Sequence, residues 1–212
     1  MTDGAQYRAP FFYLDFLLES IKQMATTALS LCSQALVKIG ANGIVSFNEN
    51  TAEAEVASYL YSSVRDALLS SYPWRFATTQ SQLVRFATTP QTDYQYSFAL
   101  PKDFLRALSL GTVYKGYGTD YRICENELQT NQKDVILTYI FRPQEEMFPA
   151  FFAEALVSKL AAEFCLPLTE STSRAEYLNK RAQTDISSAR LIDAQQAMPK
   201  VIDDFSLIGV RQ

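Results

Sequence analysis

The residue types that carry most enzyme chemistry are scarce in this sequence. Histidine is absent from all 212 residues, which excludes Ser-His-Asp and Cys-His nucleophile systems and every zinc site that needs an imidazole ligand. The three cysteines, Cys32, Cys124 and Cys165, are widely separated in apolar surroundings and form no CxxC pair. A zinc ribbon or a redox-active dithiol is therefore not expected. We interpret the cysteines as small buried hydrophobic residues in a protein of a reducing compartment.

The charged residues offer no catalytic pattern either. The adjacent acid pairs Glu145-Glu146 and Asp203-Asp204 have no partner cluster, so we interpret them as solvated charges and not as a metal site or a glycosidase dyad. Lys102 follows a proline in a turn and lacks the apolar pocket that a catalytic lysine needs. No phosphate-binding glycine loop and no GxSxG motif occurs. We expect no enzyme activity, no metal and no cofactor.

Aromatic residues between positions 94 and 121 are a second class of candidates. Together with Arg106 and Arg122 they could form a platform on which nucleic-acid bases stack. Aromatics that alternate along a strand more often pack a core or an interface. The net charge of −4 and the pI near 5.0 argue against a protein that grips phosphates. The aromatics in question are Tyr94, Tyr96, Phe98, Phe104, Tyr114, Tyr117 and Tyr121.

Both ends of the chain carry apolar segments. The run from Pro10 to Leu18 is far shorter than the roughly 20 residues that span a bilayer, and Asp15 interrupts it. We expect no membrane span and no signal peptide, and we interpret the run as a short amphipathic or core-docking helix. Met24 is a sound alternative start, so residues 1–23 are either a native peripheral extension or the product of an upstream start codon.

The C-terminal tail, residues 199–212, is too short and irregular to bury its own apolar side chains. Left exposed, they would form a patch of the kind that marks a binding site. The alternative is that the tail folds back on its own helices. The six residues concerned are Val201, Ile202, Phe205, Leu207, Ile208 and Val210.

Hydrophobic periodicity predicts helices over residues 28–39, 51–72, 149–166 and 173–197. The first begins at Thr26 or Thr27 and stops at Gly40, and the third stops at Pro167. Capping boxes are expected at Asn50 with Glu53 and at Ser173 with Glu176.

Apolar stripes at helical spacing predict the inner faces of these helices. In the second helix the stripe is Val56, Tyr59, Leu60, Val64, Ala67 and Leu68. In the fourth helix it is Leu178, Ala182, Ile186, Ala189 and Ile192.

Between Trp74 and Pro143 the helical pattern gives way to strand patterns, which predict one small antiparallel sheet. Strands are expected at 75–79, 94–98, 105–114, 121–124 and 135–141, with hairpin turns at 116–120 and 131–134. The fold class is mainly α with an inserted antiparallel β lobe (α+β). Residues 24–74 and 143–198 form a helical body, residues 75–142 form the lobe, and Pro73 and Trp74 form the junction.

Four stretches in order resemble one family. They are ALSLCSQALVKIGA (28–41), LYSSVRDALLSSYPW (60–74), YSFALPKDFLR (96–106) and FFAEALVSKLAAE (151–163). Together they resemble the tail tubular protein A family, the head–tail adaptors of short-tailed phages and related prophage-like particles. The resemblance covers residues 24 to 198 and leaves the first 23 outside.

The resemblance implies a structural protein of the virion, made in the cytoplasm of a bacterial host. Such proteins form a ring, usually of twelve copies, beneath the portal protein. The lobe, with Tyr114, Tyr117 and Tyr121 as candidates, would receive the next tail component, a nozzle or stopper protein. The C-terminal tail would contact the portal. Packaged double-stranded DNA would pass through the lumen without tight binding. The alternative function is a single-stranded nucleic-acid-binding module that uses the aromatics of the lobe.

Overall fold

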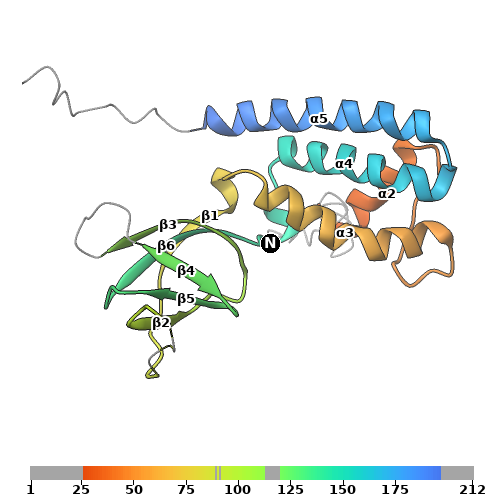
Figure 1. Cartoon of the computed structure of the whole chain (residues 1–212). Helices are drawn as coiled ribbons and strands as arrows, with labels where there is room; N and C mark the ends of the chain where they lie inside the picture. The colour runs from red at the N-terminus through yellow and green to blue at the C-terminus, as the bar shows by residue number, and fades with distance from the viewer. Residues whose placement is uncertain (1–25, 89, 91, 113–119, 197–212) are drawn as a thin grey trace, which may run out of the picture.

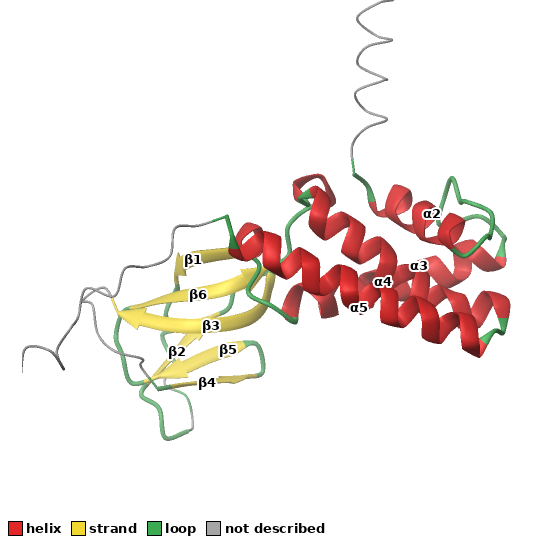
Figure 2. Cartoon of the chain, turned by 90° about the horizontal axis from the view of Figure 1, so that it is seen from above, coloured by secondary structure: helices red, strands yellow, loops and turns green. Residues whose placement is uncertain are grey.

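The computed structural model describes residues 26–88, 90, 92–112 and 120–196. The protein has an α+β fold in which a helical body and a β lobe lie at opposite ends (Figures 1 and 2). The helices are α2 (Ala28–Lys38), α3 (Ala52–Ser70), α4 (Ala150–Thr169) and α5 (Thr172–Ala194). The strands are β1 (Thr78–Gln82), β2 (Tyr96–Ala99), β3 (Phe104–Thr112), β4 (Tyr121–Cys124), β5 (Glu127–Thr130) and β6 (Val135–Phe141). Short 3₁₀ turns, η1 (Arg75–Ala77) and η2 (Glu145–Met147), link the two parts.

Helix α4 is the centre of the body, and α2, α3 and α5 all pack against it. Its apolar residues surround the helix, because Phe152, Leu156, Leu160 and Phe164 repeat every four residues and alanines fill the other sides. All four side chains are fully buried. A helix that is apolar on all sides is stable in water only when neighbours cover it. This explains why the other helices gather around α4.

The helix ends follow local capping chemistry, although two predicted caps are wrong. Thr27 begins α2 with a reciprocal capping box to Ser30, and Gly40 follows the helix with a φ of 77° that costs glycine little. Helix α3 is capped by Thr51, whose hydroxyl accepts the Ala54 amide, and not by Asn50. Helix α5 begins after Ser171, so the predicted pair of Ser173 and Glu176 lies inside it.

The end of α4 also differs from the prediction. Pro167 lies within the helix, which continues to Thr169 and closes at the left-handed residue Glu170. A proline in a helix lacks the N–H donor and crowds the carbonyl of the residue four positions earlier, but here the helix ends only one turn later. The Thr169 hydroxyl donates to the Cys165 carbonyl at 2.6 Å and so provides another partner for the last turn.

The inner face of α3 is rotated from the predicted stripe, whereas on α5 Ala182, Ile186 and Ala189 are buried as predicted and only the end of the stripe differs. On α3 the buried residues include Ala54, Ala57, Tyr61 and Leu68. Tyr59 is 73% exposed, Ala67 is exposed, and Leu60 and Val64 are only half-buried. On α5, Ile192 is 45% exposed and the neighbouring Asp193 is completely buried. On α3, packing against α4 buries one edge of the apolar stripe and leaves the other edge at the surface.

The β lobe contains two three-stranded antiparallel sheets instead of the single predicted sheet. Their strand orders are β1-β6-β3 and β2-β5-β4. Strand β5 was not predicted; it pairs with β4 through a tight turn at Glu125 and Asn126, which both have positive φ, as type I′ hairpin turns require. Residues 75–77 form η1 and not a strand. Residues 131–134 join strands of different sheets and are therefore not a hairpin turn.

The two sheets share one apolar core, separate from that of the body. Its buried members come from both sheets and the segments beside them: Leu83, Phe98, Leu110, Leu128, Val135, Leu137 and Tyr139. Ile140 of β6 instead belongs to the core of the body. Strand β6 therefore contributes to both cores and ties the lobe to the helices.

Candidate functional site

The junction between body and lobe is organised around Trp74. The ring is completely buried, and its indole N–H donates to the Leu68 carbonyl at 3.1 Å. It meets Tyr72 and Phe152 edge-on, with ring centroids 5.0 and 5.1 Å apart. Pro73, which is exposed, lies between the C-terminal end of α3 and Trp74. Trp74 therefore serves as a core anchor and presents no surface to a ligand.

A half-buried ion network links α3 to the segment that leaves the lobe. Glu145 accepts hydrogen bonds from Arg65 Nη1 at 2.8 Å and from the Tyr61 hydroxyl at 3.0 Å. Burial and the charge of Glu145 raise the pKa of the Tyr61 phenol. Burial alone would lower the pKa of Arg65, but its hydrogen bonds to Asp66 and Glu145 raise it. Glu145 is thus a structural ion-pair partner, and its interpretation as a solvated charge is wrong.

Asp66 and Arg106 add two further bonds across the same junction. Arg142, at the end of β6, pairs with the Asp66 carboxylate at 2.7 Å. Arg106 of β3 donates to the carbonyl of Ser70 at 2.8 Å. Both bonds join a strand of the lobe to the C-terminal half of α3, so the lobe is held to the body by side chains as well as by the chain itself.

Asp193 fastens the end of α5 to the same linker. Its carboxylate accepts the backbone N–H of Arg75, with both oxygens 3.2 Å from the nitrogen. The Arg75 guanidinium returns a bond of 3.0 Å to the carbonyl of residue 193. Burial raises the pKa of the Asp193 carboxyl, and the contacts with Arg75 oppose that rise. The predicted stripe of α5 did not include this residue.

Ser158 has neighbours of the kind found in serine–lysine nucleophiles. Lys38 Nζ lies 3.0 Å from its hydroxyl, and the hydroxyl donates to Asp185 at 2.7 Å. A general base must have a lone pair free to take the serine proton. Lys38 instead donates to Ser158 and is paired with Glu154 at 2.5 Å. We assign this cluster to the packing of α2, α4 and α5. In the described part of the chain, no group of three or more His, Cys, Asp or Glu residues is placed to hold a metal ion.

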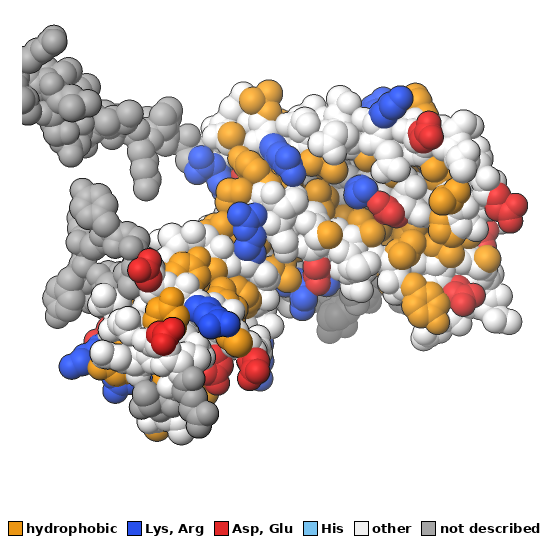
Figure 3. Space-filling model, viewed as in Figure 1, with side chains coloured by type: hydrophobic (Ala, Val, Ile, Leu, Met, Phe, Trp, Pro, Cys, Tyr) orange, Lys and Arg blue, Asp and Glu red, His pale blue; other side chains and the backbone are white. Residues whose placement is uncertain are grey.

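A groove is formed at the surface by α3, α4 and α5. Helices α3 and α5 both pack on α4 but make few contacts with each other, which leaves a gap of about 460 Å³ above α4. Hydrophobic side chains gather on this face between α3 and α5 (Figure 3). The groove residues are Leu60, Ser63, Val64, Ala67, Leu68, Ser71, Lys159, Glu163, Gln183, Ile186 and Arg190.

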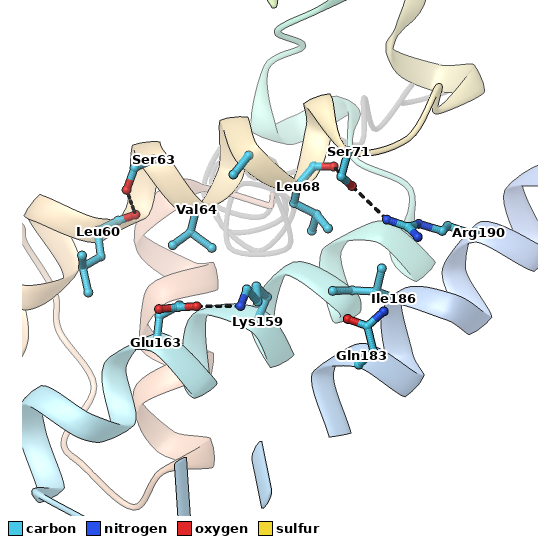
Figure 4. A pocket seen from close by; sticks show the side chains of 11 residues that line it. Leu60, Ser63, Val64, Leu68, Ser71, Lys159, Glu163, Gln183, Ile186 and Arg190 are labelled. Atoms are coloured by element: carbon cyan, nitrogen blue, oxygen red, sulfur yellow. Dashed lines mark hydrogen bonds and ion pairs between the residues drawn. The ribbon is translucent and has the colours of Figure 1, made fainter. Parts of the chain in front are cut away.

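The groove combines an apolar floor with fixed charges (Figure 4). Leu60, Val64 and Leu68 extend from α3 toward α4. Lys159 and Glu163 of α4 form an ion pair of 2.6 Å. At the other end, Arg190 donates to the Ser71 hydroxyl at 3.1 Å and lies over the Tyr72 ring.

One hydrogen-bond donor of a groove residue is unused among the described residues. The Nε of Arg190 is buried and has no hydrogen-bond acceptor among the described residues. A buried donor without a partner costs free energy. Because this atom is shielded from solvent, a ligand in the groove would reach it only if the Arg190 side chain moved.

Most of the surface candidates from the sequence lie outside the described residues. This is true of Val201, Ile202, Phe205, Leu207, Ile208 and Val210 of the tail, and of Tyr114 and Tyr117 of the lobe. Tyr121 is described: it begins β4 and is half-buried against the core of the lobe. The prediction that the three lobe tyrosines form one surface therefore stays a prediction, because only Tyr121 is described.

Most described aromatics of the lobe pack on its core, whereas Phe86 is 40% exposed. Phe98 is 1% exposed, and Tyr96 and Phe104 lie against the core of the lobe. Arg106 is bonded to the body. Cys32 and Cys165 are buried as expected, but Cys124 is half-buried beside the β4–β5 turn.

Sequence reasoning missed the groove although its apolar residues were visible. Leu60, Val64 and Ala67 were placed on the inner face of their helix. The available signal was that the stripe is wider than one helix contact can cover.

No helix among the described residues is long and apolar enough to cross a membrane. No family model matches the chain, and no curated protein matches it significantly.

Proposed function

We propose that the protein is a structural head–tail adaptor, which assembles as a ring beneath the portal of a phage or phage-like particle. The observation that carries the proposal is the order of the four resembling stretches. They fall on α2, on the second half of α3 up to Trp74, on β2 and the start of β3, and on α4. These elements are the framework of the body and its connections to the lobe, and they occur in the order that the resemblance implies.

The shape of the molecule supports the same proposal. A body of packed helices can stand beside copies of itself, and a lobe at one end can meet a different partner (Figure 2). The junction is stiffened by a buried tryptophan and by several ion pairs. A connector needs rigidity between its two contact surfaces more than it needs a catalytic group. In the proposal, the tail from residue 199 contacts the portal and the lobe faces the next tail component, a nozzle or stopper protein.

The charge distribution fits a channel through which DNA slides. The net charge is −3 over residues 1–74, +2 over 75–143 and −3 over 144–212. An acidic body repels phosphates, so a lumen built from it would not hold DNA. The lobe aromatics Tyr96, Phe98 and Phe104 pack on the core of the lobe, which weakens the alternative of a single-strand-binding module that uses them.

Co-assembly with the portal protein of the same particle is the decisive experiment. Mixing the two should give a complex in which a ring of this chain stacks on the portal ring, measured by mass photometry and electron microscopy. A chain that lacks residues 200–212 should lose the complex and keep its melting temperature. Failure of the full chain to bind portal, together with submicromolar binding of single-stranded DNA at physiological salt, would reject the adaptor in favour of the alternative.

A further inference from the structure

The loop that joins α2 to α3 contains an asparagine followed by a glycine, Asn42 and Gly43. The other five asparagines of the chain are each followed by a residue with a side chain. Both Asn42 and Gly43 are exposed. Because glycine has no Cβ, another group can approach its main-chain nitrogen closely. This nitrogen is therefore accessible to the side-chain amide of the asparagine that precedes it.

The structure holds the loop on either side of this pair and leaves the pair itself free. The Ala41 amide donates to the Leu36 carbonyl at 3.0 Å. Ser33 binds Ile44 through two hydrogen bonds, because its hydroxyl donates to the carbonyl at 2.7 Å and accepts the amide at 3.1 Å. Within the described residues, the N–H of Gly43 makes no hydrogen bond. No hydrogen bond of the described structure has to break before this nitrogen can react.

We propose that Asn42 is a site of spontaneous deamidation. The N–H of Gly43 loses its proton to hydroxide, and the nitrogen forms a bond with the side-chain carbonyl carbon of Asn42. The C–N bond of the side-chain amide breaks, and the nitrogen leaves as ammonia with a proton from water, which restores the hydroxide and leaves a five-membered succinimide. Water then opens the ring at either carbonyl to give aspartate or isoaspartate. The net change is the addition of water and the loss of ammonia.

The isoaspartate product has a structural consequence, because its main chain runs through the Cβ of residue 42 and is one carbon atom longer. Only residues 42 and 43 span the distance between Ala41 and Ile44, which are both held by hydrogen bonds to α2. A longer chain between them displaces one of the two. Ile44 is 5% exposed and belongs to the core of the body. We therefore expect the isoaspartyl form to lose protection at Ile44, whereas a normal aspartate keeps the chain length and both contacts.

Peptide mapping of the full chain after incubation at mildly alkaline pH tests the site. Mass spectrometry of the tryptic peptide 39–65 should show that Asn42 deamidates faster than Asn48 and Asn50 by about tenfold or more, because the residues after those two carry side chains. Asn48 and Asn50 lie in the same peptide and are internal controls. Methyl transfer from S-adenosylmethionine by an isoaspartyl methyltransferase should rise in parallel. The rate should increase with pH, since the attacking nitrogen must lose its proton.

Three variants separate the chemistry from its consequence. In Gly43→Ala, the added Cβ meets side-chain atoms of Ser33 at 3.6 and 3.7 Å, which is ordinary van der Waals contact, so this chain should fold while deamidation slows. Asn42→Gln cannot form the five-membered ring and should stay intact. Freshly purified Asn42→Asp has the new charge without the longer chain. Hydrogen exchange at Ile44 should be unchanged in Asn42→Asp and faster in the isoaspartyl fraction of the aged protein, with β6 as the internal reference.

Two outcomes would overturn the proposal. Asn42 could stay intact in the folded chain while a synthetic peptide of residues 36–50 deamidates under the same conditions, which would show that the fold protects it. Alternatively, Asn42 could react no faster than Asn48, which would show that the missing side chain at residue 43 does not control the rate. An isoaspartyl form with unchanged exchange at Ile44 would refute the displacement. None of these results involves portal binding, so this proposal and the proposed function fail separately.

Discussion

Replacement of Asp193 tests how much its hydrogen bond to Arg75 stabilises the contact between α5 and the linker that joins body and lobe. The carboxylate is completely buried and accepts the Arg75 N–H at 3.2 Å. Alanine at this position removes the acceptor and leaves that donor unsatisfied, which costs about 1–3 kcal/mol when the donor is buried. Because the Arg75 amide is only partly buried, we expect about 1–2 kcal/mol. In a chain of this size, the melting temperature should fall by roughly 2–8 °C.

Asparagine at position 193 separates the hydrogen bond from the charge. It keeps one acceptor oxygen for Arg75 and removes the penalty of burying a carboxylate, so Asp193→Asn should cost less than about 1 kcal/mol near neutral pH. Urea denaturation of the three proteins gives the free energies of unfolding. An alanine variant as stable as the asparagine variant would show that the Arg75 bond contributes nothing.

The pH dependence has a definite sign. Burial raises the pKa of Asp193 in the folded state above its ordinary value of 3.8, so the folded protein binds this proton more tightly than the unfolded chain. The resulting stabilisation is complete below the unfolded pKa and is lost as pH rises through the folded pKa. Asparagine does not titrate. The stability of the unmodified protein relative to Asp193→Asn should therefore decrease from about pH 4 to neutral pH.

This comparison cancels the titration of every other group that is unchanged between the two proteins. A control with Glu176→Gln, which alters an exposed acid on the same helix, should show no such trend. A difference between the unmodified protein and Asp193→Asn that is constant with pH, or that grows as pH rises, would refute the assignment of burial as the dominant influence on this carboxyl.

Three further predictions concern the cores. Leu156 is fully buried in α4, so Leu156→Ala should lower the free energy of unfolding by about 2–5 kcal/mol; an unchanged urea midpoint would contradict its placement. Trp74 is buried among aromatic rings, so its fluorescence should be blue-shifted and resist acrylamide, and the spectrum of an exposed indole would count against this junction. Burial raises the pKa of the Cys32 thiol to about 12, so iodoacetamide at pH 8 should label Cys124 in the native protein well before Cys32, and the reverse order would exclude this arrangement.

The candidate surfaces were predictable only in part. The apolar stripe of the second predicted helix contains Leu60, Val64 and Ala67 of the groove, but periodicity predicts the whole stripe to be buried in the helical body. The Nε of Arg190 is buried without an acceptor among the described residues, and nothing in the sequence signals this. Likewise, Glu145 became an ion-pair partner only because Arg65 and Tyr61, some 80 residues earlier, lie beside it.

Local chemistry was sufficient to predict helices α2 to α5 and most of the strands in their order, but not strand β5. Helical spacing, the threonine cap of α2, Gly40 and the step from Pro73 to Trp74 act over a few residues, and the α+β fold follows from them. Which edge of α3 or α5 turns inward, and how six strands divide into two sheets, depend on partners far along the chain. Asp193 shows the difference most clearly. Its neighbour Ile192 is the better core residue by composition, but the structure buries the aspartate, whose carboxylate accepts a backbone N–H from Arg75, 118 positions away in the sequence.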